Sequence, residues 1–138
     1  MLQAVAERNN YSLIGKMLAS FMPEVYLEIE ELVRSGQQTD LRKIPDYFAA
    51  FQLLSAESGV ESRRLFTATM LKLYHPYAIE RGLINVKHGF VREIRHCFGC
   101  KQQSITRDIR EVVVYYKAYE EFRQKVNELA KELKDRGV

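Results

Sequence analysis

Residues 91–110 read VREIRHCFGCKQQSITRDIR, two amphipathic pieces separated by one glycine, Gly99. Apolar residues four apart share one face of an α-helix. The pattern therefore predicts two helices that pack against each other, and glycine supplies the backbone freedom for a sharp turn between them, with Cys100 filling the turn. The two helices are expected to meet through four apolar side chains at helical spacing: Ile94, Phe98, Ile105 and Ile109.

The polar side of the second piece has side chains suited to DNA. Glutamine pairs with adenine and arginine with guanine through two hydrogen bonds each, while lysine, serine and threonine can hold phosphates. A helix N-terminus also presents unpaired backbone N–H groups to phosphate. We expect Lys87, Arg92 and Arg95 to contact phosphates as well. The residues expected to enter the groove or lie at its edge are Lys101, Gln102, Gln103, Ser104, Thr106, Arg107 and Arg110.

Two short strings in this stretch resemble known regulators. CKQQSI, residues 100–105, resembles the turn and recognition-helix start of phage-type repressors. SITRDIREV, residues 104–112, resembles the recognition helix of arginine-repressor and DeoR-type regulators. The resemblance covers about 20 residues and implies a helix-turn-helix that enters a major groove, with bases contacted by Gln102, Gln103, Thr106 and Arg107. Winged regulators continue with a β-hairpin, but residues 112–116 keep the helical period, so we expect no wing.

Helical periodicity extends over the rest of the chain, and strict alternation of apolar and polar residues is nearly absent. The sequence therefore predicts an all-α multi-helix bundle. Capping and turn residues set the expected bounds. The expected helices run from Ser12 as N-cap to about Phe21, from Pro23 to Arg34 before Gly36, from Asp40 or Pro45 through Asp46 to Ser55, from Val60 to Tyr74, from Pro76 to Arg81, and from Asn85 as N-cap to Phe98.

The C-terminal part predicts one long helix, because neither proline nor glycine occurs from Gln102 to Asp135. Such a helix is about 50 Å long at 1.5 Å per residue. We expect its far end to pack against a second copy and form a homodimer; folding back onto the N-terminal helices is the alternative. Its near-heptad apolar stripe has one irregular step, from Tyr119 to Phe122. The stripe comprises Ile105, Ile109, Val112, Tyr116, Tyr119, Phe122, Val126, Leu129 and Leu133.

Charge is distributed unevenly along the chain. Residues 1–59 contain five Lys/Arg and eight Asp/Glu, a net charge of 5 − 8 = −3, whereas residues 60–138 contain 16 and 10, a net charge of +6. We therefore distinguish an acidic helical region, residues 1–58, from a basic region, residues 60–138, within what we expect to be one compact unit. A basic region of this kind attracts polyanions such as double-stranded DNA.

Several classes of protein are not expected. No uncharged stretch approaches the roughly 20 apolar residues of a membrane span, and the N-terminal segment lacks the order of a signal peptide, so we expect a cytoplasmic protein without membrane contact. No phosphate loop or nucleophile motif occurs, so we expect no enzyme and no cofactor. Cys97-x-x-Cys100 with His88 or His96 could hold zinc, but no second cysteine pair is present, and two reduced thiols are the simpler interpretation.

One alternative to DNA binding is open at this point. A non-catalytic helical adaptor could pair its C-terminal helix with a helix of a partner protein, and the basic patch would then be incidental. Salt dependence separates the two, because DNA binding weakens steeply as salt rises.

Overall fold

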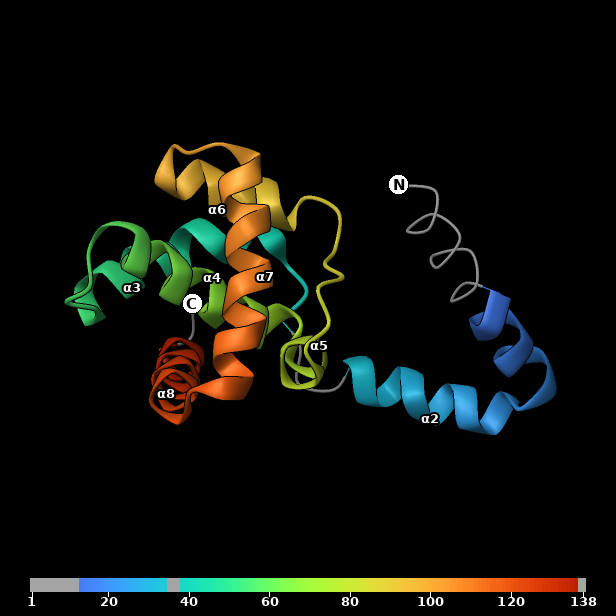
Figure 1. Cartoon of the computed structure of the whole chain (residues 1–138). Coiled ribbons are helices and arrows are strands. Elements are labelled where there is room, and N and C mark those ends of the chain that lie inside the picture. Colours follow the sequence, from blue (N-terminus) through green and yellow to red (C-terminus); the bar gives the residue numbers. More distant parts are fainter. Residues whose placement is uncertain (1–12, 35–37, 137–138) are drawn as a thin grey trace. The chain divides into compact units, whose positions relative to one another are not determined.

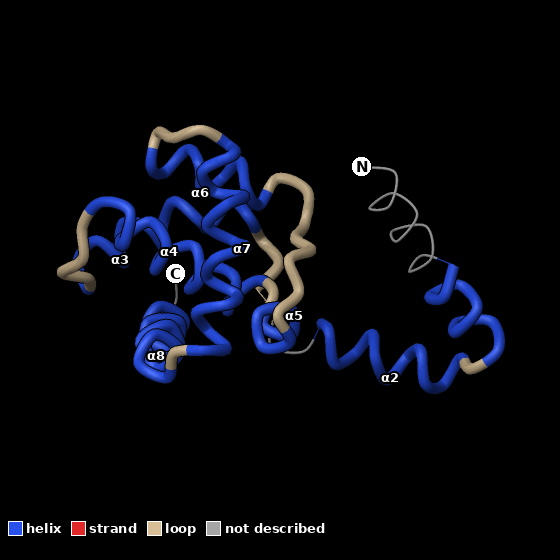
Figure 2. The backbone as a smooth tube through the Cα atoms, viewed as in Figure 1, coloured by secondary structure: helices blue, strands red, loops and turns tan. Residues whose placement is uncertain are grey.

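The computed structural model describes the backbone of residues 13–34 and 38–136. The expected all-α fold is confirmed, since only helices, turns and loops occur in these two ranges (Figure 2). The chain divides into two units, Met1–Ser35 and Gly36–Val138. The boundary between these two units therefore lies earlier in the chain than Gly59, where the sequence changes from net negative to net positive charge. None of the described helices is both long and apolar enough to cross a bilayer.

The first unit contains the two expected N-terminal helices. Residues 13–21 are helical, and α2 spans Pro23–Arg34, as predicted. Proline suits the first turn of α2, where its missing N–H would have no partner. The predicted capping residue Ser12 and the predicted helix stop at Gly36 lie outside the described residues.

The second unit is a bundle of helices (Figure 1). Both expected starts near residue 40 are used: Asp40 caps a short 3-10 turn through its side chain, and Pro45 lies in the first turn of the helix that follows. The expected helices at residues 60–74 and 76–81 are confirmed. The elements are η1 (Leu41–Lys43), α3 (Ile44–Leu54), α4 (Gly59–Tyr74), α5 (Pro76–Arg81), α6 (Phe90–Phe98), α7 (Gln102–Ala118) and α8 (Glu120–Asp135).

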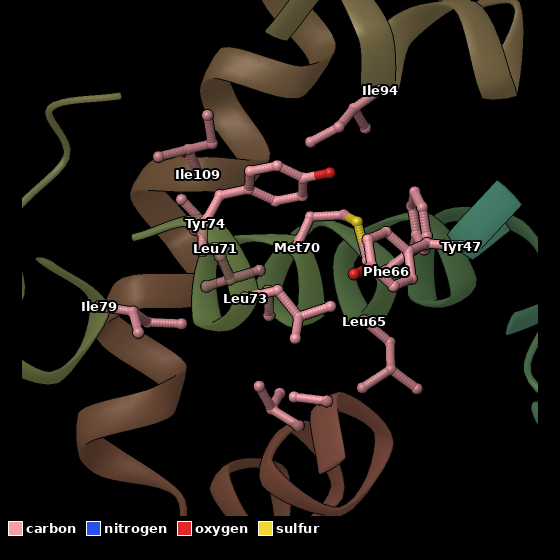
Figure 3. Packing of buried hydrophobic residues seen from close by; sticks show 14 of the residues in the cluster. Tyr47, Leu65, Phe66, Met70, Leu71, Leu73, Tyr74, Ile79, Ile94 and Ile109 are labelled. Carbon is pink, nitrogen blue, oxygen red and sulfur yellow. The ribbon is translucent and has the colours of Figure 1, made fainter. Parts of the chain in front are cut away.

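Helix α4 is the centre of the core, because α3, α5, α7 and α8 all contact it. Every residue from Leu65 to Leu71 is buried, which requires neighbours on all sides of the helix. Figure 3 shows its side chains between Ile94 and Ile109 on one side and α8 on the other. The ring of Phe66 lies 5.1 Å from that of Phe51 and 5.7 Å from that of Phe98, which ties α3, α4 and α6 together.

The prediction of one continuous helix over residues 102–135 is wrong. The helix is interrupted at Tyr119, whose backbone is extended at φ −116° and ψ 111°, within the irregular step of the apolar stripe. Two of the last carbonyls of α7 are nevertheless satisfied, because Nη1 of Arg123 donates to the carbonyls of Tyr116 and Lys117 at 3.2 and 3.3 Å. The hydroxyl of Tyr116 donates to Asn127 at 2.9 Å and fastens the two helices together.

Helix α8 folds back onto its own chain (Figure 1). It contacts α3, α4 and α7, and its apolar residues Val126, Ala130 and Leu133 are buried. The alternative of folding back is thus the one observed, although the partner helices are α3 and α4. Most of the apolar stripe that predicted a homodimer is buried inside this unit, whereas Phe122 and Leu129 are partly buried and Tyr119 is 59% exposed.

The predicted start of the fifth helix at Asn85 is also wrong. Helix α6 begins at Phe90, after Gly89 in a left-handed conformation at φ 89°, and the preceding residues form a loop (Figure 2). The loop is anchored to the core, because the backbone N–H of Lys87 donates to Nε2 of the buried His75 at 3.3 Å. This tertiary contact competes with capping at Asn85, and no local sequence signal reports it.

Candidate nucleic-acid interface

Helices α6 and α7 are joined by the bend predicted at Gly99. The glycine has φ 60° and ψ 32°, and its N–H donates to the carbonyl of Arg95, which ends α6 at Phe98 as expected. Lys101 is extended at φ −79° and ψ 151°, and α7 starts at the next residue. Of the four apolar residues expected to join the helices, Ile94, Ile105 and Ile109 are buried, and Phe98 packs on the core as a partly buried residue.

Replacing Gly99 with Val should lower the free energy of unfolding by about 1–2 kcal/mol, because a residue with a Cβ is strained in the left-handed conformation. No atom outside the neighbouring residues lies within 4 Å of the position a Cβ would take, so the penalty is conformational rather than steric. Gly99→Asn is the matched control, since asparagine tolerates this conformation better. Urea unfolding measures both; equal stability of the Val and Asn variants would contradict a left-handed bend.

The residues predicted to contact DNA all reach the surface. Lys101, Gln102, Gln103, Arg107 and Arg110 are exposed, while Ser104 and Thr106 are half-buried at the edge. Residues three or four apart share a helix face, so the exposed members extend over the first three turns of α7. The hydroxyl of Thr106 donates to the carbonyl of Gln102 at 3.1 Å. Arg92 on α6 is exposed, whereas Arg95 and Lys87 are half-buried.

The single acidic residue among positions 99–110 faces inward. Asp108 is fully buried, and its carboxylate accepts hydrogen bonds from Arg63 Nε at 2.5 Å and Nη2 at 3.3 Å. Arg64 Nε lies 3.6 Å from the same carboxylate, and its Nη2 pairs with Glu111. The negative charge on this part of α7 is thus neutralised inside the protein, and the outward face has only neutral and cationic side chains.

Sequence reasoning missed this ion pair, although a signal was present. Asp108 lies between Ile105 and Val112 on the apolar face of α7, three or four residues from each. An acid at such a position needs a buried cation. Because Arg63 and Arg64 are paired with acids, they do not contribute unpaired positive charge to the basic region. The same holds for Lys72, which pairs with Glu80.

The cysteine pair has the properties of ordinary thiols. Cys97 and Cys100 are free and half-buried, and burial raises the pKa of Cys97 to about 11, so little of that thiol is the reactive thiolate at neutral pH. Among the described side chains, no group of three His, Cys, Asp or Glu residues lies close enough together to hold a metal ion.

These features define the candidate interface as the outward face of α7 next to the Gly99 bend. No family model matches the chain, and neither the curated proteins nor the solved structures include a match to it.

Proposed function

We propose that this protein binds double-stranded DNA in a sequence-specific manner, with α6, the Gly99 bend and α7 serving as a helix-turn-helix. It acts as a transcriptional regulator or as an accessory protein of a mobile element, and not as an enzyme. The observation that favours this function most is the burial and neutralisation of Asp108. It leaves Gln102, Gln103 and Arg107 on a face where the nearest carboxylate of α7, that of Glu111, is half-buried and paired with Arg64, which limits repulsion of a phosphate backbone.

In this mechanism α7 enters the major groove with its N-terminal turns first. Gln102, Gln103 and Arg107 contact base edges, because amide and guanidinium groups match adenine and guanine through paired hydrogen bonds. Lys101 and Arg110 lie beside them and contact bases or the backbone. Lys87, Arg92 and Arg95 neutralise phosphates, which positions the protein without selecting sequence.

The proposal places the protein in the cytoplasm, where free thiols such as Cys97 and Cys100 stay reduced. A homodimer would bind a site with two-fold symmetry. Since Val126 and Leu133 of the apolar stripe are buried within the unit, such a dimer would have to form through other residues. The symmetry of the preferred DNA site tests this point.

Selection from random duplex DNA tests the proposed function directly. We expect an enriched motif whose binding weakens with salt at a log–log slope of about −0.9 per phosphate contact, or about −5 if all six cations of the interface take part. Absence of binding to duplex DNA even at low salt would contradict DNA binding and favour the adaptor alternative.

Replacing Arg107 with Ala should weaken binding to the selected site by about 1–3 kcal/mol, because a guanine would lose a bidentate partner. Fluorescence anisotropy with a labelled duplex measures the change. Lys131→Ala is the matched control, since Lys131 is exposed on α8, away from the interface. If the two variants bind equally well, Arg107 does not contact a base.

A further inference from the structure

A groove runs along α8 where it faces the turn between α3 and α4. It consists of two adjoining hollows of about 260 and 380 Å³ that share Glu57, Leu65 and Lys125. Both are open to the surface. Apolar side chains from α3, α4 and α8 line the groove: Leu54, Leu65, Phe122 and Leu129.

The edges of this groove are acidic, although residues 60–138 have a net charge of +6. Glu57 and Glu61 come from the α3–α4 turn and the first turn of α4, and Glu128 and Glu132 come from α8. Within the described residues, Glu61 and Glu128 form no ion pair. These carboxylates are therefore available to an outside cation.

Two of the four acids are paired, Glu57 with Lys125 and Glu132 with Arg136, which leaves Glu61 and Glu128 unmatched among the described residues. Lys125 pairs with Glu57 at 3.2 Å, and Arg64 pairs with Asp108 and Glu111 on α7. Both positive charges are thus matched by neighbouring carboxylates. An apolar floor bordered by unmatched carboxylates repels phosphates and anionic lipid surfaces, and it suits a ligand that is both apolar and positively charged.

We infer that this groove binds an amphipathic helix of a partner protein, with an apolar stripe on one side and lysine or arginine residues beside it. The apolar stripe would cover the half-buried Phe122 and Leu129, as in other helix-in-groove interfaces. Its cations would face Glu61 and Glu128. Tyr115 of α7 lines the groove. It lies about 18 Å along the helix axis from Gln103, which belongs to the candidate DNA interface. Since the groove is also formed by α8 and the α3–α4 turn, a partner here leaves the first turns of α7 uncovered.

A pair of synthetic helical peptides tests the inference on the full chain. Both have about 14 residues with leucine at helical spacing; one has lysine at its remaining charged positions and the other glutamate. By fluorescence anisotropy at about 0.15 M salt, we expect the lysine peptide to bind and the glutamate peptide not to bind. Amide NMR shifts should change at Leu129 and Glu61 but not at Gln103.

Charge reversal of the groove provides the matched variants. The double variant Glu61→Lys, Glu128→Lys should weaken binding of the lysine peptide about tenfold, because attraction becomes repulsion at two positions. The double variant Asp46→Lys, Asp135→Lys makes the same change of charge at exposed acids of the same unit that do not line the groove, and should alter the affinity less than about twofold. Replacing the leucines of the peptide with serine should abolish binding.

Four results would overturn the inference. The first two are absence of binding by the lysine peptide and an equal loss of affinity in the two double variants. The third is undiminished binding by the serine-substituted peptide. The fourth is a change in the sedimenting mass of the protein alone when the charges at Glu61 and Glu128 are reversed. The last result would make the groove a contact between copies of this chain. None of these measurements involves DNA, so the inference and the proposed function can fail separately.

Discussion

Replacing Asp108 with Ala is expected to lower the free energy of unfolding by about 3–5 kcal/mol, because it leaves a partly buried guanidinium without a counter-ion. The Asp108 side chain is fully buried, and the Arg63 side chain is only 20% exposed. Arginine does not lose its proton in proteins, so the charge of Arg63 cannot be neutralised by titration. Urea unfolding followed by circular dichroism measures the loss.

Two further variants separate the ion pair from a general effect of losing an acid. Asp135→Ala removes an exposed carboxylate from α8 and should change stability by less than about 0.5 kcal/mol. Adding Arg63→Met to Asp108→Ala should recover part of the loss, because the unpaired charge is then removed while most of the side-chain volume remains. If Asp108→Ala were as stable as Asp135→Ala, the buried pair would not hold α7 against α4.

The pair also connects stability with the proposed function. It fixes the rotation of α7 about its own axis, since Asp108 must face Arg63 on α4. Side chains on the opposite side of α7, Gln103 and Arg110 among them, therefore face outward. In a helix that could rotate, these side chains would not be held in one orientation. Ordering the helix on binding would then cost free energy and weaken the affinity.

Much of the fold could be predicted from the sequence, because local signals decide where many of its helices begin and end. Pro23, Pro76 and Gly99 each act through their own backbone geometry, whatever surrounds them. The starts of α2 and α5 and the end of α6 follow from these residues. The all-α class follows from the spacing of apolar residues, which is also a local property.

The two wrong predictions have a common cause in tertiary contacts. The break at Tyr119 lacks proline and glycine and is held by Arg123 and Asn127, which belong to the next helix. The late start of α6 depends on His75, which lies 12 residues before Lys87. Side-chain contacts of this kind compete with helix propensity, and the periodicity of the sequence does not report them.

The sequence predicted which residues are exposed at the candidate interface better than it predicted which basic residues around it lack an acidic partner. The exposed polar face of α7 follows from helical spacing once Ile105 and Ile109 are placed inside. Which basic residues remain free does not follow from spacing, because Arg63 and Arg64 are matched by acids on α7 more than 40 positions away. The acidic groove was missed for the same reason, since residues of α3, α4 and α8 meet only in the folded chain.

Acidification is expected to destabilise the protein through His75. Burial, with a smaller effect of nearby Lys87, lowers the pKa of His75 to about 4, against an ordinary value of 6.5. The unfolded chain therefore binds a proton between these two values while the folded protein does not. Stability is full above about pH 6.5 and decreases as the pH falls towards 4, by roughly 3 kcal/mol in total.

Replacing His75 with Gln should remove this dependence, because glutamine can still accept the hydrogen bond from Lys87 but has no titrating group. Urea unfolding at about pH 7 and pH 4.5 should show the natural protein losing about 2 kcal/mol more than His75→Gln. His96→Gln, which replaces an exposed histidine, should behave like the natural protein. If His75→Gln lost as much stability as the natural protein over this range, protonation of His75 would not be coupled to unfolding. The loop before α6 would then be held mainly by the contact of Phe90 with the His75 ring, whose centroids lie 4.9 Å apart.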